Sequence, residues 1–134
     1  MNVLLDTCAL LALARGELPD EASTALRTAP EAWVSAVSPW EVAIKAAARK
    51  LRLAEPPLAW FLGLAERYGL REIPLDARTA CAAAALPPIH RDPFDRVLVA
   101  LAQANTLTVL TSDENIPKYP AVKTSWRSRT HARR

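Results

Sequence analysis

Short apolar runs alternate with helical patterns along this chain, and this alternation limits the fold more than any other feature of the sequence. The apolar runs lie at residues 2–5, 33–37, 71–75 and 106–111, and the first three each lead into a stretch with helical spacing. Parallel neighbouring strands need a crossover connection between them, which is usually a helix. We therefore expect a three-layer α/β/α sandwich with a mostly parallel central sheet covered on both faces.

Two segments carry strong signals for the start of a helix. Ser38-Pro39-Trp40-Glu41 predicts a helix with Ser38 as N-cap that runs to about Lys50. Asp92-Pro93-Phe94-Asp95 repeats the pattern with Asp92 as N-cap. Further helices are expected after the first strand through Leu10 to Leu13, over Glu21 to Thr28, from Pro56-Pro57 to Gly69, and from Asp76 to Pro87-Pro88.

Four acids occupy equivalent places relative to these predicted elements. Asp6 follows the first strand and Asp113 the last clear one, whereas Glu41 and Asp95 lie in the first turns of helices. Strand ends and the starts of the following helices share one edge of an open α/β sheet, where ligands bind. Carboxylates gathered there would repel one another unless a divalent cation neutralised them. Oxygen ligands without paired His or Cys favour Mg²⁺ or Mn²⁺ over zinc.

Each acid also has an ordinary structural explanation. Glu41 completes a capping box, and Asp92 and Asp95 complement the dipole of a helix N-terminus. Asp113 suits a turn, and Asp6 could cap the helix that follows it. Four acids at one predicted edge nevertheless exceed what capping requires.

Four segments resemble the PIN-domain nucleases, in particular the VapC-type toxins of bacterial toxin–antitoxin pairs. They are Leu4-Leu5-Asp6-Thr7, Ser35-Ala36-Val37-Ser38-Pro39-Trp40-Glu41, His90-Arg91-Asp92-Pro93-Phe94-Asp95-Arg96 and Leu110-Thr111-Ser112-Asp113. Their order and spacing match over nearly the whole chain. The resemblance implies an acidic set that binds Mg²⁺ or Mn²⁺, namely Asp6, Glu41, Asp95 and Asp113. It also implies supporting roles for Thr7, Thr111 or Ser112, and for Asp92 as either a ligand-supporting group or the cap alone.

The resemblance further implies a metal-dependent endoribonuclease, in which a cation-activated water attacks the RNA phosphorus and leaves a 5′-phosphate and a 3′-hydroxyl. An antitoxin partner and a homodimer follow from the same resemblance, as does the choice of RNA over DNA. Lys45, Arg91 and Arg96 lie on or beside helices that start at the site, so they are candidates for positioning the RNA backbone. A solvated helix face is the slightly favoured explanation of these three.

Two other functions fit parts of the sequence. A phosphatase with an aspartate nucleophile after the first strand would need a second Asp two residues after Asp6, where this chain has Cys8. A non-catalytic PIN-like binding module is the other alternative, with acids that only cap helices. Its interface could use Trp33, Trp40, Trp60 and Phe61, although core packing is the default for such aromatics.

Charge is unevenly spread along the chain. From Ile116 onward there are six basic residues and no acid, which leaves 11 of the 17 Lys and Arg residues against all 14 acids in the rest. We expect a nuclease domain over residues 1–126 and a flexible basic tail at 127–134.

The sequence gives little support for membrane insertion or for bonded cysteines. No stretch approaches the ~20 apolar residues of a membrane span, and Asp6 interrupts the apolar run near the N-terminus. We therefore expect a cytoplasmic protein without a membrane partner. Cys8 and Cys81 do not form a metal or redox spacing, so two small buried thiols are expected.

Overall fold

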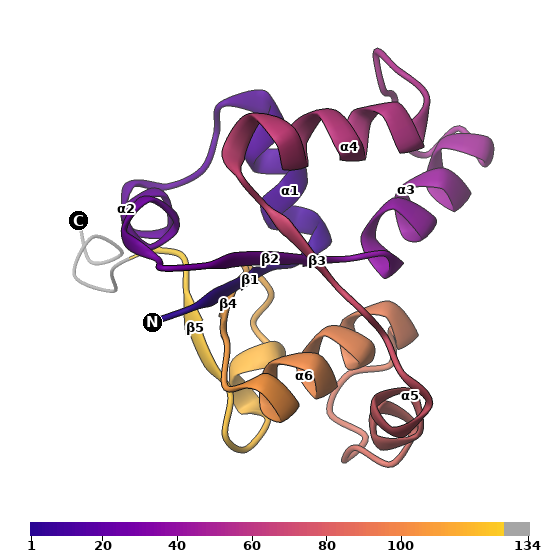
Figure 1. The fold of residues 1–134 in the computed structure, drawn as a ribbon. Coiled ribbons are helices and arrows are strands. Elements are labelled where there is room, and N and C mark those ends of the chain that lie inside the picture. Colours follow the sequence, from indigo (N-terminus) through magenta and orange to yellow (C-terminus); the bar gives the residue numbers. More distant parts are fainter. Residues whose placement is uncertain (128–134) are drawn as a thin grey trace.

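A five-stranded sheet lies between two layers of helices in the computed structural model, which describes residues 1–127 (Figure 1). The strands are β1 (Val3–Leu5), β2 (Ala32–Ser35), β3 (Arg71–Ile73), β4 (Thr108–Leu110) and β5 (Lys123–Ser125). Every neighbouring pair is parallel, and the strand order is β3-β2-β1-β4-β5. The prediction of a three-layer sandwich with a parallel sheet is confirmed.

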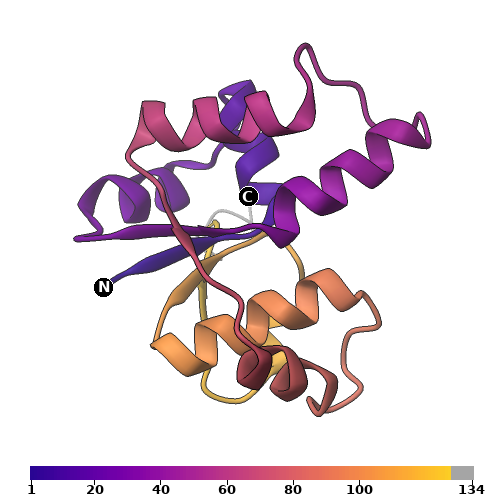
Figure 2. The ribbon, with the colours of Figure 1, turned by 45° about the vertical axis from the view of Figure 1, so that its right-hand side comes forward.

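Helices cover both faces of the sheet. One face carries α1 (Thr7–Arg15), α2 (Asp20–Thr28), α3 (Val37–Ala47) and α4 (Pro57–Tyr68). The other carries α5 (Ala77–Ala84), α6 (Pro93–Asn105) and the 3₁₀ helix η1 (Ile116–Lys118), as Figures 1 and 2 both show. Gly69 ends α4 in the left-handed conformation that the sequence predicted for it, with a φ of 65°.

The central strand β1 joins two hydrophobic cores. Successive side chains of a strand point to opposite faces of the sheet. Val3 and Leu5 accordingly pack in the core beneath α1 and α4, and Leu4 packs in the core beneath α6. All three side chains are fully buried, so the point where β1 ends, and hence the position of Asp6, is fixed by packing on both faces.

The order of the strands creates the place for a site. From β1 the chain moves outward through β2 to β3, and it then returns to β4 on the other side of β1. Connecting helices diverge where the strand order reverses, which opens a crevice beyond the carboxyl ends of those strands. Here the reversal lies between β1 and β4, where the Asp6 amide donates a hydrogen bond to the Leu110 carbonyl at 3.2 Å.

The C-terminal part of the chain adds a strand that the sequence did not predict. Lys123-Thr124-Ser125 forms the edge strand β5, which pairs only with β4 among the described residues. After it, the Trp126 carbonyl accepts a hydrogen bond from the Ala22 amide at 3.2 Å, and the Trp126 ring packs against the first core. Of the predicted basic tail, Arg127 is exposed and residues 128–134 lie outside the described part.

Two expectations about burial were wrong. Cys8 and Cys81 are free and exposed, so neither thiol is part of a hydrophobic core. Trp40 is 61% exposed, because it lies in the first turn of α3 beyond the sheet, where it contacts Phe94 edge-on at 5.1 Å. No helix within residues 1–127 has the length and apolar character needed to cross a bilayer.

Candidate active site

Asp6 links the end of β1 to the start of α1. Its Oδ1 accepts a hydrogen bond from the Ala9 amide at 2.8 Å, so the capping role that the sequence left open is real. The residue is only 1% exposed, and this burial raises the pKa of Asp6 to about 6. Hydrogen bonds from Thr111 and Ala9 lower the pKa, and the charges of Asp113 and Glu41 raise it. Asp6 is therefore a cap that also lies within range of other carboxylates.

Glu41 is a buried acid with one oxygen left without a partner. The residue is 5% exposed, and its Oε2 accepts a hydrogen bond from Lys45 Nζ at 2.7 Å. Its Oε1 is buried and accepts no hydrogen bond from the described residues. Buried polar atoms in folded proteins nearly always have a partner, because an unsatisfied one costs about 1–3 kcal/mol. This oxygen is therefore a strong candidate for binding something that the polypeptide does not supply.

The predicted capping role of Ser38 was wrong. Helix α3 begins at Val37, with Ala36 in the N-cap position, so Ser38 already lies inside its first turn. The buried Ser38 hydroxyl instead accepts a hydrogen bond from the Thr7 hydroxyl at 3.0 Å. This bond connects the first turns of α1 and α3, the two helices that carry Asp6 and Glu41.

Asp95 lies in the first turn of α6, as predicted. Asp92 caps this helix, since its Oδ1 accepts a hydrogen bond from the Phe94 amide at 2.9 Å. Burial, followed by the charges of Asp92 and Asp6, raises the pKa of Asp95 to about 7. Asp92 thus stabilises the helix start and, through its charge, makes ionisation of Asp95 less favourable.

Asp113 lies in the loop after β4 and is held from several sides. Its amide donates to the Thr111 hydroxyl at 2.9 Å, and its Oδ1 accepts from the Asn115 amide at 2.7 Å. Its Oδ2 lies 2.7 Å from Nε2 of His90. Burial acts to raise the pKa of Asp113, but the hydrogen bonds from His90 and Asn115 outweigh it and hold the pKa below its usual range.

His90 was missed as a site residue in the sequence. Its Nε2 lies between two acids, 2.7 Å from Asp113 Oδ2 and 3.1 Å from Asp95 Oδ2. The only signal in the sequence was its place in the His90-to-Arg96 segment, because a separation of 23 residues from Asp113 conceals the contact. The expectation of a site without histidine was therefore incomplete.

The four predicted acids are near enough for their charges to act on Asp6 and Asp95 at the reversal point of the sheet. Among residues 1–127, only His90, Asp95 and Asp113 bring possible ligand atoms within 4.8 Å of one another. Asp6 and Glu41 lie outside this trio, but the charges of both raise the pKa of Asp95. Figure 1 shows the starts of α3 and α6, which carry Glu41 and Asp95, at the same end of the sheet, one above and one below it.

Of the remaining predicted site residues, some bind other parts of the protein and others are exposed. The Arg96 guanidinium donates to the carbonyls of Ala84, Leu86, Pro87 and His90, so it holds the loop between α5 and α6. Lys45 pairs with Glu41, whereas Arg91 and Ser112 are exposed.

The donor set fits a hard divalent cation. Carboxylate oxygens are the ligands that Mg²⁺ and Mn²⁺ prefer. Burial is the main cause of the raised pKa values of Asp6 and Asp95, and neighbouring carboxylates raise them further; a bound cation would stabilise both acids in their charged form. Oε1 of Glu41 is also available to a ligand.

Comparison with known proteins gives the family. A family model described as "PIN domain" matches residues 3–122. The chain belongs to the PIN-domain family. Ribonuclease VapC22 of Mycobacterium tuberculosis (strain ATCC 25618 / H37Rv) is 33% identical to this PIN domain over 108 residues, which span 78% of this chain and 82% of that protein.

Solved structures share the fold of this PIN domain at low sequence identity. VapBC2 from Rickettsia felis, bound to a DNA fragment from its promoter, matches with a TM-score of 0.69 at 15% identity, covering 95% of this chain and 100% of that one. A toxin–antitoxin complex from Klebsiella pneumoniae matches with a TM-score of 0.63 at 22% identity, covering 90% and 94%.

Proposed function

We propose that this PIN domain is a metal-dependent endoribonuclease and the toxin of a VapBC-type toxin–antitoxin pair. The observation that carries the metal-dependent part is the buried, unpartnered Oε1 of Glu41 in a cluster where Asp6 and Asp95 resist ionisation. The ribonuclease part is supported by membership of the family and by the 33% identity to a ribonuclease. RNA is accordingly the proposed substrate and the cytoplasm the proposed place of action.

The four acids have distinct roles in this proposal. Asp6, Glu41 and Asp95 would hold Mg²⁺ or Mn²⁺, and Asp113 would complete the set. A cation bound there would lower the pKa of a water molecule and would neutralise charge on the phosphoryl oxygens. Thr7 and Thr111 would keep the acids in place. The Thr7 hydroxyl connects α1 to α3 through its hydrogen bond to Ser38. The Thr111 side chain forms a hydrogen bond with the Asp6 carboxylate, and its hydroxyl accepts one from the Asp113 amide.

The test of this function is RNA cleavage with and without a divalent cation. Mg²⁺ or Mn²⁺ should support cleavage, and a chelator should stop it. Asp95→Asn should lower the cleavage rate by about 100-fold or more, because the amide removes a ligand charge while the Asp92 cap remains. Glu66→Gln, an exposed acid of α4, is the matched control and should cleave normally. Equal activity of Asp95→Asn and the wild type would remove Asp95 from the site.

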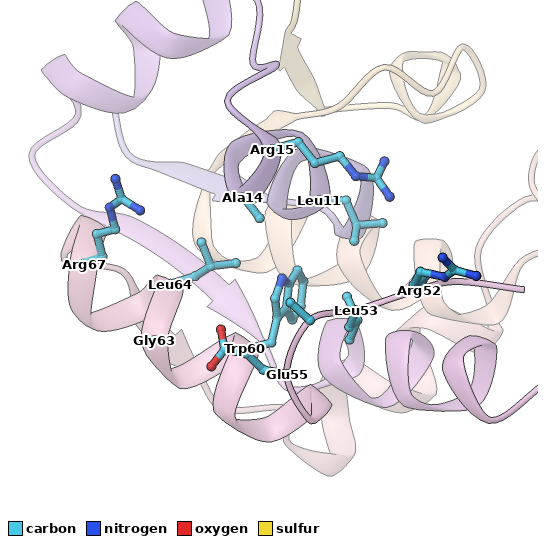
Figure 3. Close-up of a pocket in the computed structure, with 11 residues that line it drawn as sticks. Leu11, Ala14, Arg15, Arg52, Leu53, Glu55, Trp60, Gly63, Leu64 and Arg67 are labelled. Carbon is cyan, nitrogen blue, oxygen red and sulfur yellow. The ribbon is translucent and has the colours of Figure 1, made fainter. Parts of the chain in front are cut away.

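An antitoxin partner is supported by a groove between α1 and α4 (Figure 3). The groove measures about 440 Å³, and its apolar floor includes Leu11, Trp60 and Leu64. Arg15, Arg52 and Arg67 surround the floor, with Glu55 as the acid of the lining, so an acidic segment with apolar anchors fits it by charge. A nine-residue helix is about 13 Å long, so a partner bound here needs only a few extended residues to reach Asp6 at the other end of α1.

Reversing one charge of this groove tests the docking site. Arg67→Glu should weaken binding of the antitoxin about tenfold or more, because it repels an acidic segment, and should leave RNA cleavage unchanged. Arg78→Glu makes the same charge change at an exposed position of α5 on the opposite face and serves as control. Calorimetric titration with the antitoxin measures both variants. Equal affinities would place the partner elsewhere.

A homodimer is the final part of the proposal. It is supported by large apolar side chains that remain exposed on α3 and α4, namely Ile44, Leu58 and Leu62. Sedimentation velocity of the protein without antitoxin measures the oligomeric state directly, and a monomer across micromolar concentrations would exclude a stable dimer.

A further inference from the structure

His90 lies inside the acidic cluster, yet the chemistry proposed above gives it no role. Its side chain is 14% exposed, and its ring precedes the Asp92 cap of α6 by two residues. One nitrogen atom, Nε2, contacts carboxylates from two separate elements, the first turn of α6 and the loop after β4. No other described side chain connects Asp95 to Asp113 in this way.

Three contacts from the surrounding chain fix the position of His90. Its amide donates to the hydroxyl of the buried Tyr119 at 2.7 Å, and its carbonyl accepts from Arg96 at 3.1 Å. Its ring Nδ1 accepts a hydrogen bond from the Asp92 amide at 3.1 Å. The position of the ring is therefore fixed by the hydrogen bonds of the His90 backbone and by the one that Nδ1 accepts.

The Asp92 contact also determines which ring nitrogen carries the proton. An amide N–H can only donate, so Nδ1 must be the unprotonated, accepting nitrogen. The proton of the neutral ring then lies on Nε2, which donates to Asp113 and Asp95. In this state Nε2 has no free lone pair, so it cannot act as a metal ligand.

We propose that His90 is a positioning residue whose Nε2–H holds the carboxylates of Asp95 and Asp113 in the arrangement that a divalent cation binds. The proposal rests on the metal-dependent function proposed above. Binding through Nε2 itself would require the ring proton to move to Nδ1, where it would face the hydrogen of the Asp92 amide, whose nitrogen lies 3.1 Å from Nδ1. Hydrogen bonds from such neighbouring groups orient metal-binding carboxylates and typically change metal affinity 10–100-fold.

Calorimetric titration with Mn²⁺, without RNA, tests this role apart from activity. His90→Ala should weaken Mn²⁺ binding about 10–100-fold. His90→Gln should recover most of the affinity, because its side-chain amide supplies an N–H donor at a similar distance from the backbone. Thermal unfolding of each metal-free variant checks the fold, and His90→Leu replaces the alanine variant if that one does not fold.

Asp95→Asn distinguishes failure of this inference from failure of the proposed function. If the wild type and Asp95→Asn bind Mn²⁺ equally, the acidic cluster is not the metal site and both proposals fail. If Asp95→Asn loses binding while His90→Ala binds as tightly as the wild type, or more tightly, only the role of His90 is overturned. Equal weakening in the Gln and Ala variants would also overturn it, because the donor would then not be the cause.

Nitrogen NMR provides a second readout that a merely structural histidine would not satisfy. The chain has two histidines, so the signals of His90 are identified by their loss in His90→Gln. The diamagnetic ion Mg²⁺ should leave the ring of His90 neutral with its proton on Nε2. A neutral ring with its only proton on Nδ1 in the presence of Mg²⁺ would leave Nε2 free to bind the ion and would contradict the proposal.

Discussion

At the scale of single residues, Asp6 combines two roles that the sequence presented as alternatives. One carboxylate oxygen caps α1 through the Ala9 amide, and the same side chain lies in the electrostatic field of Asp113 and Glu41. A cap alone is satisfied by an exposed carboxylate, since its hydrogen bond favours the charged form. The nearly complete burial of Asp6 instead raises its pKa, which indicates a carboxylate placed for a ligand as well as for the helix.

The raised carboxyl pKa values predict an unusual dependence of stability on pH. The folded, metal-free protein holds the protons of Asp6 and Asp95 more tightly than the unfolded chain does, because both pKa values exceed the ordinary 3.8. The free energy of unfolding should therefore fall as pH rises from about 5 to 7, on the order of 4 kcal/mol.

Denaturant unfolding at several pH values, with a chelator present, measures this effect. Mn²⁺ should restore stability at pH 8 more than at pH 5, since protonated carboxylates bind the ion poorly. The double variant Asp6→Asn and Asp95→Asn should flatten the pH dependence. Stability that rises over this pH range in the metal-free wild type would contradict the assignment of these two groups.

The acids of the site could be predicted from the sequence, but the residues that hold them in place could not all be. Asp6, Glu41 and Asp95 could be placed because each adjoins a predicted strand end or helix start. The cap was wrongly assigned to Ser38, because α3 begins at Val37 with Ala36 as its N-cap, so Ser38 already lies inside the helix. His90 could not be found, because its role depends on contacts across the fold with Asp113 and Tyr119.

At the scale of elements, the loop between α5 and α6 is organised by one side chain. Arg96 lies on α6 and donates to four carbonyls between Ala84 and His90. Charged donors make stronger hydrogen bonds than neutral ones, and the planar guanidinium serves several acceptors at once. Arg96 therefore fixes the loop that positions His90 through its hydrogen bonds. This role differs from the RNA contact that was considered for it from the sequence.

Replacing Arg96 should loosen this loop and reduce stability. Arg96→Met leaves four carbonyls without their donor, and we expect a loss of about 2 kcal/mol in the free energy of unfolding. Arg96→Lys should lie between this variant and the wild type, because an ammonium group cannot reproduce the planar fork. Urea unfolding measures all three, with the exposed Arg91→Met as control. Equal losses at positions 91 and 96 would contradict the bracing role.

The strand β5 could not be predicted from the pattern of apolar residues. Residues 123–125 are Lys, Thr and Ser, and their side chains are exposed or half-buried, so no apolar run indicates a strand. Their pairing with β4 is an edge contact through the backbone, with Thr108 opposite Lys123. Buried strands such as β1 and β4 are predictable because both faces require apolar residues, whereas this edge strand is not.

At the scale of the whole molecule, the fold places two surfaces along one helix. The N-terminus of α1 carries Asp6 in the acidic cluster, and its later residues Leu11 and Arg15 line the arginine-bordered groove. A partner in the groove and a cation in the cluster would therefore act at opposite ends of the same nine-residue helix. This arrangement allows a bound partner to cover the site without any change in the fold.

Anomalous X-ray diffraction from crystals soaked in Mn²⁺ would show where the ion binds without reference to activity. We predict a Mn²⁺ peak bounded by the carboxylates of Asp6, Glu41, Asp95 and Asp113, with Oε1 of Glu41 directed at the ion or at one of its waters. Crystals of Asp95→Asn should lose the peak. A fully soaked wild-type crystal with no peak among these side chains would contradict the account.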